Sequence, residues 1–502
     1  MNIAEAKEQI RDTVRLYLKK DELGDYVLPL VRQRPIFLLG APGIGKTAIM
    51  EQIASELGIA LVSYSMTHHT RQSALGLPFI AKKDYGGKEF SVSEYTMSEI
   101  IASVYDTMEE SGLKEGILFL DEINCVSETL YPSMLQFLQY KVFGRHRVPE
   151  GWVVVTAGNP PEYNRMVREF DVVTLDRVRL IETEADLKAW QNYAYRQHIH
   201  PAIVSYLELR PEDFYRMELT AEGREYVTAR GWEDLSRVLL LCEEEGMAAG
   251  ESVIRQYLHH ETVVKEFAAY YELYRKYEKD YSPLGILKGE GTELMRDRVR
   301  EAPFDERILL SSMLSERIET DMRRVLQGLD ALGRLQTVLK AWKAKQEESS
   351  GAEILSKGEE ALREKEKRLG AAQSLSDEER SSIRRTLFLY DELRAKIAEE
   401  SREEGRSAFG IAEAWYMEKL SGVKEESAQI SERLKNLFCF AEEAFGEGQE
   451  LLLLLTRLTV NADASRFIAL FGSEEYSRLS AGMMVRERGQ DLRKEIEALG
   501  VF

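Results

Sequence analysis

The sequence predicts an α/β domain built on a mainly parallel sheet, followed by helical regions that fill the rest of the chain. In the first 180 residues, short apolar runs alternate with helical patterns. Buried strands separated by helices form parallel sheets that are covered on both faces. All 12 prolines lie at or before Pro303, so residues 304–502 contain none. Because proline breaks helix interiors, this Leu-, Glu-, Lys-, Arg- and Ala-rich stretch is expected to be mostly helical.

Each element of the α/β part has its own signal. Apolar runs predict strands at 35–39, 59–65, 116–120 and 152–157. Helical patterns follow at 45–57, 98–111 and 127–140, and Thr96-Met-Ser-Glu99 reads as a cap for the second of them. Together these elements make a sheet sandwiched between helices.

Three domains are expected along the chain. The first is an α/β nucleotide-binding domain with an N-terminal helix at 1–182, and the second is a helical lid at 183–300, with caps at Thr183 and Thr220. The third is an all-helical region at 301–502. Its segment 341–410 is dense in charge, which predicts exposed helical hairpins or a coiled coil, and Ser376 begins a capping box.

The composition is that of an acidic globular protein. The 502 residues carry a formal net charge of −19, and acidic residues outnumber basic ones both before and after Pro303. Because nucleic-acid backbones need concentrated Lys and Arg, a nucleic-acid partner is not expected. No apolar run is long enough to span a bilayer, so membrane insertion is not expected. The three cysteines form no close pair, which favours the reducing cytoplasm.

A phosphate-binding loop follows the first apolar run. The segment 40–47 fits the pattern G-x-x-x-x-G-K-[ST] between a strand and a helix. Its glycines let backbone N–H groups face a phosphate, and the helix that begins there adds its positive end. Lysine can reach the β- and γ-phosphates, and the threonine hydroxyl can bind Mg²⁺. The expected nucleotide-binding residues are Gly40, Ala41, Pro42, Gly43, Ile44, Gly45, Lys46 and Thr47. The loop does not distinguish ATP from GTP.

A second acidic element follows 75 residues after Lys46, counted along the printed sequence. The buried run Gly-Ile-Leu-Phe-Leu ends in Asp121 and Glu122, and ligands bind at the carboxyl ends of strands in such sheets. Asp121, with Thr47, is expected to hold Mg²⁺. Glu122 is expected to polarise the attacking water as a general base.

These motifs, in this order, resemble the MoxR-like branch of the AAA+ ATPases. The resemblance covers residues 1–280 and not the last 200 residues. It rests on GAPGIGKT, the strand that ends in Asp121-Glu122-Ile-Asn124, VVVTAGNPP up to Pro161, VVTLDRVRLIE, and Thr-Ala-Arg230-Gly-Trp. It implies an AAA+ domain with a helical lid that hydrolyses ATP with Mg²⁺. It also implies self-assembly into a ring, commonly a hexamer, and a von Willebrand factor A-domain partner.

The resemblance also implies roles for three further residues. Asn159 occupies the sensor-1 position, Arg177 the arginine-finger position and Arg230 the sensor-2 position. The chain departs from the family pattern at Cys125, where a basic residue is common, and Arg179 and Arg237 compete for the finger and sensor-2 positions.

Simple chemistry gives two of these roles an alternative interpretation. A turn-forming Asn before two prolines is the alternative for Asn159, and a surface ion pair is the alternative for Arg177. A finger that acts on a neighbour's nucleotide requires a ring.

Two insertions read as hairpins. One centres on Asp84-Tyr-Gly-Gly-Lys88, and the other lies in QYKVFGRHRVPEGW before the strand at 152–157. In MoxR-like proteins the corresponding inserts lie near the central pore and before sensor 1. We expect these loops to grip a protein client; sealing of subunit contacts is the alternative.

The expected function is ATP-driven, chaperone-like remodelling or metal-cofactor maturation of protein partners. Two other classes remain open from the sequence: a nucleoside-triphosphate-driven motor acting on nucleic acid in defence, and a nucleotide-gated scaffold that does not hydrolyse. The acidic charge balance speaks against the first, and the intact Asp121-Glu122 pair speaks against the second.

Overall fold

The computed structural model describes residues 1–68, 70–163, 167–220, 223–344, 351–400, 407–446 and 448–481. The three domains expected from the sequence stay a prediction. Contacts within the chain group it into two compact units. The first unit comprises Met1–Ala189 and Lys357–Ile383, and the second comprises Trp190–Ser356 and Arg384–Phe502.

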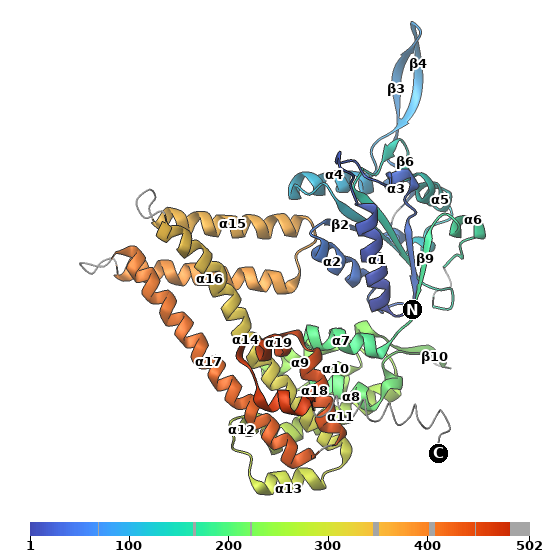
Figure 1. Ribbon diagram of the computed structural model, residues 1–502. Coiled ribbons are helices and arrows are strands. Elements are labelled where there is room, and N and C mark those ends of the chain that lie inside the picture. Colours follow the sequence, from blue (N-terminus) through green and yellow to red (C-terminus); the bar gives the residue numbers. More distant parts are fainter. Residues whose placement is uncertain are drawn as a thin grey trace, which may run out of the picture. The chain divides into compact units, whose positions relative to one another are not determined.

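A five-stranded parallel sheet organises the first unit, with strand order β2-β5-β8-β1-β9 (Figure 1). The four expected strands are present, and Arg179–Thr183 adds a fifth at one edge. The strands are β1 (Ile36–Gly40), β2 (Ala60–Ser65), β5 (Gly116–Asp121), β8 (Trp152–Gly158) and β9 (Arg179–Thr183). The parallel arrangement follows from helices that return the chain between strands, so the predicted α/β sandwich is confirmed.

Helices cover both faces of the sheet, because successive side chains of a strand point to opposite sides. Ile117 and Phe119 of β5 pack in one core with α1 and α2, whereas Leu118 and Leu120 pack in another with α4 and α5. The helices of this unit are α1 (Ile3–Tyr17), α2 (Lys46–Leu57), α3 (Arg71–Leu75), α4 (Glu99–Ser111), α5 (Tyr131–Tyr140) and α6 (Val172–Leu175). Short 3₁₀ turns lie at Leu30–Arg32 (η1), Met66–His68 (η2) and Ile123–Cys125 (η3).

Two small antiparallel hairpins interrupt this pattern where turn residues were found in the sequence. β3 (Pro78–Tyr85) pairs with β4 (Lys88–Tyr95) and projects from the sheet (Figure 1). Gly86 and Gly87 both have positive φ angles, 66° and 83°, as a two-residue hairpin turn requires. β6 (Val142–Phe143) pairs with β7 (His146–Arg147).

The cap of α4 differs from the expected one. Ser98, not Thr96, accepts the Ile101 N–H at the start of the helix. Thr96 instead exchanges hydrogen bonds with Leu77 and closes the β3–β4 hairpin. Both residues can cap a helix, and the hairpin determines which one is free to do so.

A turn from the helical part of the chain covers the free edge of the sheet. The Leu61 N–H on edge strand β2 donates to the Ala372 carbonyl at 2.8 Å. Ala372 is fully buried in the core that contains α4 and α5. The turn joins α15 (Gly351–Ala371) to α16 (Asp377–Glu400), and the Ser376 hydroxyl accepts the Glu379 N–H as the capping box predicted. Covering an edge strand removes an open row of backbone donors and acceptors.

The second unit is mainly helical, as the sequence predicts, with one exception. Residues expected to be helical form the hairpin β10 (Arg216–Thr220) and β11 (Gly223–Val227). Thr220 therefore ends strand β10, and Thr183 ends β9 in the first unit, so neither stands at the start of a helix. The cap of the following helix α9 is Thr228, whose hydroxyl accepts the Gly231 N–H.

Long helices form the main core of this unit. α14 and α17 run antiparallel, since Trp342 contacts Phe409 at one end and Asp321 pairs with Arg433 towards the other. Among the described residues, none of the helices combines the length and apolar character needed to cross a bilayer. The helices are α7 (Leu187–Gln197, which begins in the first unit), α8 (Pro201–Leu209), α9 (Ala229–Glu244), α10 (Glu251–Ile254), α11 (Glu261–Tyr281), α12 (Pro283–Leu287), α13 (Glu293–Glu301), α14 (Phe304–Ala344), α17 (Ala408–Phe445), α18 (Gln449–Val460) and α19 (Ala462–Phe471), with a 3₁₀ turn η4 at Pro211–Asp213.

Candidate active site

The loop between β1 and α2 has the conformation that a phosphate cradle needs. Gly43 and Gly45 have φ angles of 74° and 97°, in the region that side chains disfavour. Gly45 is the N-cap of α2 and offers no side chain to the first helical turn. The N–H groups of that turn therefore face outward without a capping oxygen, which favours an anion.

Lys46 is the buried cation of this loop. Its Nζ donates to the carbonyls of Gly40 and Ala41, both at 2.8 Å, and to Asn159 Oδ1 at 2.8 Å. Lys46 is only 8% exposed. The phosphate loop and the end of β8 are thus joined through a single charged group.

Thr47 and Asp121 place oxygen atoms side by side. The Thr47 hydroxyl donates to Asp121 Oδ2 at 3.2 Å, which joins the start of α2 to the end of β5. Hydroxyl and carboxylate oxygens are the hard ligands that Mg²⁺ prefers, and it usually takes only one or two from protein. The pair therefore fits the expected metal position.

Glu122 is held by hydroxyl groups that the sequence analysis did not single out. Its Oε2 accepts hydrogen bonds from Ser65 at 2.9 Å and Thr67 at 3.0 Å, at the carboxyl end of β2. Glu122 itself has φ 56°, a left-handed conformation that costs free energy for a residue with a side chain. The sequence signal for these hydroxyl groups was the polar stretch that directly follows the buried start of β2, Ser63-Tyr64-Ser65.

Asn124 connects the acidic strand end to the next strand. Its Nδ2 donates to the Asn159 carbonyl at 2.8 Å, and its own carbonyl accepts the Arg168 N–H at 2.9 Å. The side chain is 3% exposed and lies so close to Gly158 that a Cβ there would come within 2.5 Å of Asn124 Oδ1. Asn124 thereby fixes the backbone that carries the Asn159 amide.

The two candidate finger arginines differ in their contacts. Arg179 lies on β9 and donates to the Thr13 hydroxyl at 2.6 Å. Within the described parts of the chain, the Arg177 side chain makes no hydrogen bond or ion pair. The pKa of Asp171 is lowered, first by its hydrogen bonds with Thr174 and less by the charge of Arg177. The structure does not join Arg177 to the phosphate loop of the same chain.

The two candidate sensor-2 arginines lie on α9 in the second unit. Arg237 pairs with Glu233 and Asp234 on its own helix. Arg230 is exposed in the first turn of α9 and has no ion pair with a described residue.

The structure thus brings together most of the predicted site. The loop from Gly40 to Thr47, Asp121, Glu122 and Asn159 all lie at the carboxyl ends of the parallel strands of the first unit. This edge is where ligands of open α/β sheets bind.

Comparison with known families matches this same part of the chain. Residues 36–168 match the family model described as ATPase family associated with various cellular activities (AAA). The match begins on β1 and includes the phosphate loop, the Asp121-Glu122 pair and Asn159. No curated protein matches the sequence. Residues 36–168 therefore form an AAA ATPase family domain, a nucleotide-binding fold.

Proposed function

We propose, from the AAA domain at residues 36–168, that the chain hydrolyses ATP with Mg²⁺ and uses the energy to remodel protein partners in the manner of MoxR-type ATPases. The observation that carries the proposal is the convergence of Lys46, Thr47, Asp121, Glu122 and Asn159 at one sheet edge. Bound Mg²⁺ would neutralise charge on the β- and γ-phosphates.

The protein's own groups then have separable tasks. Backbone N–H groups of Gly43 to Thr47 bind the phosphates, and Lys46 turns from the loop carbonyls towards them. Glu122 leaves its hydroxyl donors and accepts a proton from the attacking water. The Asn159 amide, held by Asn124 through its backbone, orients that water or the γ-phosphate.

Arg177 is proposed to act on the nucleotide of a neighbouring copy. A cation without an ion pair among the described residues is suited to such a role, and a head-to-tail contact of this kind closes into a ring, which we propose is hexameric. Arg230 is proposed as the sensor-2 residue, because Arg237 is already engaged by two carboxylates.

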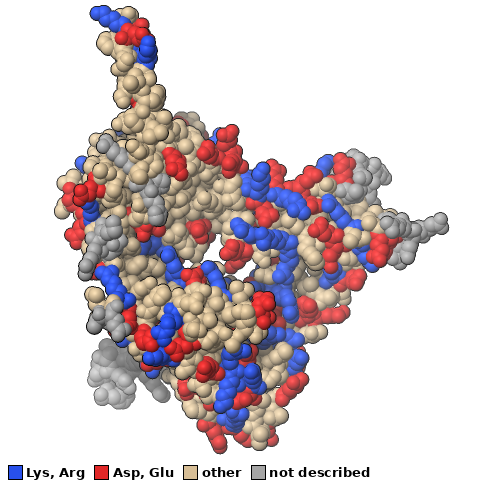
Figure 2. Space-filling view, turned by 180° about the vertical axis from the view of Figure 1, so that it is seen from behind, with Lys and Arg blue, Asp and Glu red and all other residues tan. Residues whose placement is uncertain are grey.

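The β3–β4 hairpin is the proposed client-binding element. Phe79, Ile80, Tyr85 and Phe90 are 44%, 78%, 56% and 49% exposed, an unusual density of exposed apolar side chains for a two-stranded element. Figure 2 shows charges of both signs at the far end of this hairpin and few along its stem. Mixed charge and exposed aromatic groups suit an unfolded peptide better than a nucleic-acid backbone.

The helical C-terminal region, expected at residues 301–502, is the proposed docking platform for a von Willebrand factor A-domain partner. The expectation comes from the MoxR resemblance, and co-purification with such a protein would support it. Absence of any such partner among proteins captured by the nucleotide-trapped form described next would count against it.

The test of the enzyme proposal separates binding from turnover. Glu122→Gln should keep ATP affinity and lose hydrolysis by about 10²-fold or more, because general-base catalysis contributes about 10²–10⁴-fold. Lys46→Ala should lose binding. Glu109→Gln, on the exposed face of α4, is the matched control and should resemble the unaltered protein. Unchanged turnover in Glu122→Gln would overturn the proposed role of this carboxylate.

A mixing experiment tests the finger. Arg177→Ala and Lys46→Ala should each be inactive alone, but their mixture should regain activity, since one copy supplies the finger and the other an intact loop. No recovery in a mixture shown to co-assemble would contradict action between subunits.

The double variant Phe79→Ala, Tyr85→Ala tests the β3–β4 hairpin. It should abolish remodelling of a client while basal hydrolysis stays.

A further inference from the structure

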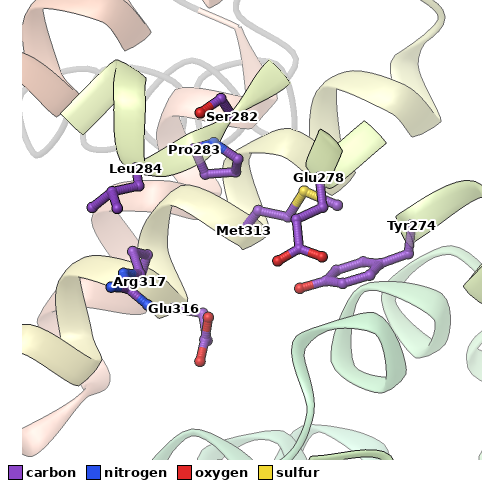
Figure 3. A pocket seen from close by; sticks show the side chains of 8 residues that line it. All are labelled: Tyr274, Glu278, Ser282, Pro283, Leu284, Met313, Glu316 and Arg317. Atoms are coloured by element: carbon purple, nitrogen blue, oxygen red, sulfur yellow. The ribbon is translucent and has the colours of Figure 1, made fainter. Parts of the chain in front are cut away.

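A cavity in the second unit combines acidic, apolar and unpaired polar groups (Figure 3). It has a volume of about 310 Å³ and lies between the end of α11, the start of α12 and the first half of α14. Its lining residues are Tyr274, Glu278, Ser282, Pro283, Leu284, Met313, Glu316 and Arg317. All belong to one compact unit and none belongs to the nucleotide site.

The Tyr274 hydroxyl is the feature that points to a ligand. Tyr274 is 5% exposed, and its hydroxyl makes no hydrogen bond with any described residue. Figure 3 shows this hydroxyl directed into the cavity, between Glu278 and Glu316. Because this hydroxyl faces the cavity, a polar ligand that enters the cavity can hydrogen-bond to it in place of solvent.

Carboxylates make the surroundings of this hydroxyl negative. Burial first, and then the charges of Glu316, Glu243 and Glu278, raise the pKa of Tyr274. Desolvation at the cavity wall and then the charge of Glu243 raise the pKa of Glu278, against the opposing charge of Arg275, although much of the residue is exposed. A positive ligand would stabilise the ionised Glu278 and donate a hydrogen bond to each carboxylate.

Two of these three glutamates, Glu278 and Glu316, are available to bind a ligand. Glu243 is already engaged by His200 at 3.1 Å and Tyr271 at 2.9 Å. The Glu278 side chain makes no hydrogen bond or ion pair within the described residues, and Glu316 accepts only the Thr320 hydroxyl at 3.3 Å among them. Arg317 is exposed at the cavity, has no carboxylate partner among the described residues, and can bind a carboxylate of the ligand.

We propose that this cavity binds a small aliphatic molecule through an ammonium group. The ammonium donates to Glu278, Glu316 and the Tyr274 oxygen, while Pro283, Leu284 and Met313 contact the aliphatic part. A lone methylammonium would leave those apolar groups uncovered, and a dicarboxylate would place like charge beside two glutamates.

Calorimetric titration of the full chain tests the proposal with three probes of similar size. These are 1,5-diaminopentane, leucine and the neutral 1,5-pentanediol. Either amine should bind saturably and the diol should not. Preference for leucine over the diamine would assign the carboxylate contact to Arg317, and Arg317→Gln should then remove that preference.

Variants localise the binding. Tyr274→Phe and Glu278→Gln should each weaken amine binding about tenfold, the usual effect of losing one hydrogen bond to a charged group. Glu272→Gln, an exposed acid on the same helix that does not line the cavity, should leave binding unchanged. Absence of amine binding, or equal weakening in Glu272→Gln, would overturn the proposal. Far-ultraviolet circular dichroism of each variant separates lost binding from lost folding.

Discussion

The Ser65 hydroxyl donates a 2.9 Å hydrogen bond to Glu122 Oε2, so the end of edge strand β2 holds the proposed general base. Thr67 donates to the same oxygen at 3.0 Å. Both hydrogen bonds occupy the oxygen that would accept the proton of water, so they must break before Glu122 can act as a base. The two hydroxyls therefore restrain the proposed chemistry.

Replacement of Ser65 by Ala together with Thr67 by Val should raise basal ATP turnover. The expected rise in kcat is about 3- to 10-fold, because one hydrogen bond to a charged group contributes about 1.5–3 kcal/mol, of which only part is lost when water replaces it. Steady-state kinetics at saturating ATP measure this. A fall in kcat would show instead that the hydroxyls orient Glu122 productively.

Asn124 should act as a positioning residue for Asn159. In Asn124→Asp the carboxylate cannot donate to the Asn159 carbonyl, so the shape stays but the hydrogen bond is lost. We expect kcat to fall about tenfold or more while KM for ATP changes little, since a small misplacement of an orienting group affects mainly the transition state. An equal rise in KM would indicate that the loop itself is distorted.

A side chain at position 40 should destabilise the first unit. A Cβ there would lie 2.1 Å from Thr183 Oγ1 and 3.0 Å from the Thr183 carbonyl, where β1 packs beside β9. Gly40→Ala should lower the free energy of unfolding of the first unit by about 1–3 kcal/mol, as for other overpacked positions. Gly370→Ala is the control, because nothing lies within 4 Å of its added Cβ and α15 is helical there. It should stabilise the unit by about 0.5–1 kcal/mol, and urea unfolding monitored by circular dichroism compares the two.

His198 should make the second unit sensitive to acid. Burial, and then the charges of Arg323 and Arg457, lower its pKa from 6.5 to about 3. The unfolded chain therefore takes up a proton between pH 6.5 and 3 that the folded chain does not. The stability that comes from neutral His198 is complete above pH 6.5 and is lost as the pH falls towards 3, by at most about 1.4 kcal/mol per pH unit.

Asn in place of His198 isolates this effect. His198 has φ 58°, a conformation that Asn adopts readily, and Asn does not titrate. Guanidinium unfolding between pH 4 and 7 should show a shallower loss of stability in His198→Asn than in the unaltered chain. Identical slopes would mean that His198 is protonated to the same extent in both states.

Local sequence patterns were sufficient to predict the nucleotide-binding domain of this protein. Four apolar runs, a glycine-rich loop and paired acids at a strand end suffice, because each depends on residues adjacent in sequence: Gly43 and Gly45 for the curl, Lys46 and Thr47 at a helix start, and Asp121 after a buried run. The strand β9 escaped prediction because it is short and its partner β1 lies far away in the sequence. The hairpin β10–β11 is also short and lies in a stretch with a helical pattern, which outweighs the alternation of Met217 and Leu219 with polar residues.

Only the tertiary structure decided which distant residues meet. Ser65 contacts Glu122 across 57 positions, Asn124 contacts Asn159 across 35, and Ala372 covers Leu61 from a helical turn more than 300 residues away. The Tyr274 hydroxyl faces a cavity only because α11, α12 and α14 pack around one. The physical reason is that a side chain's partners depend on how strands are ordered and helices packed, and periodicity within one segment carries no information about either.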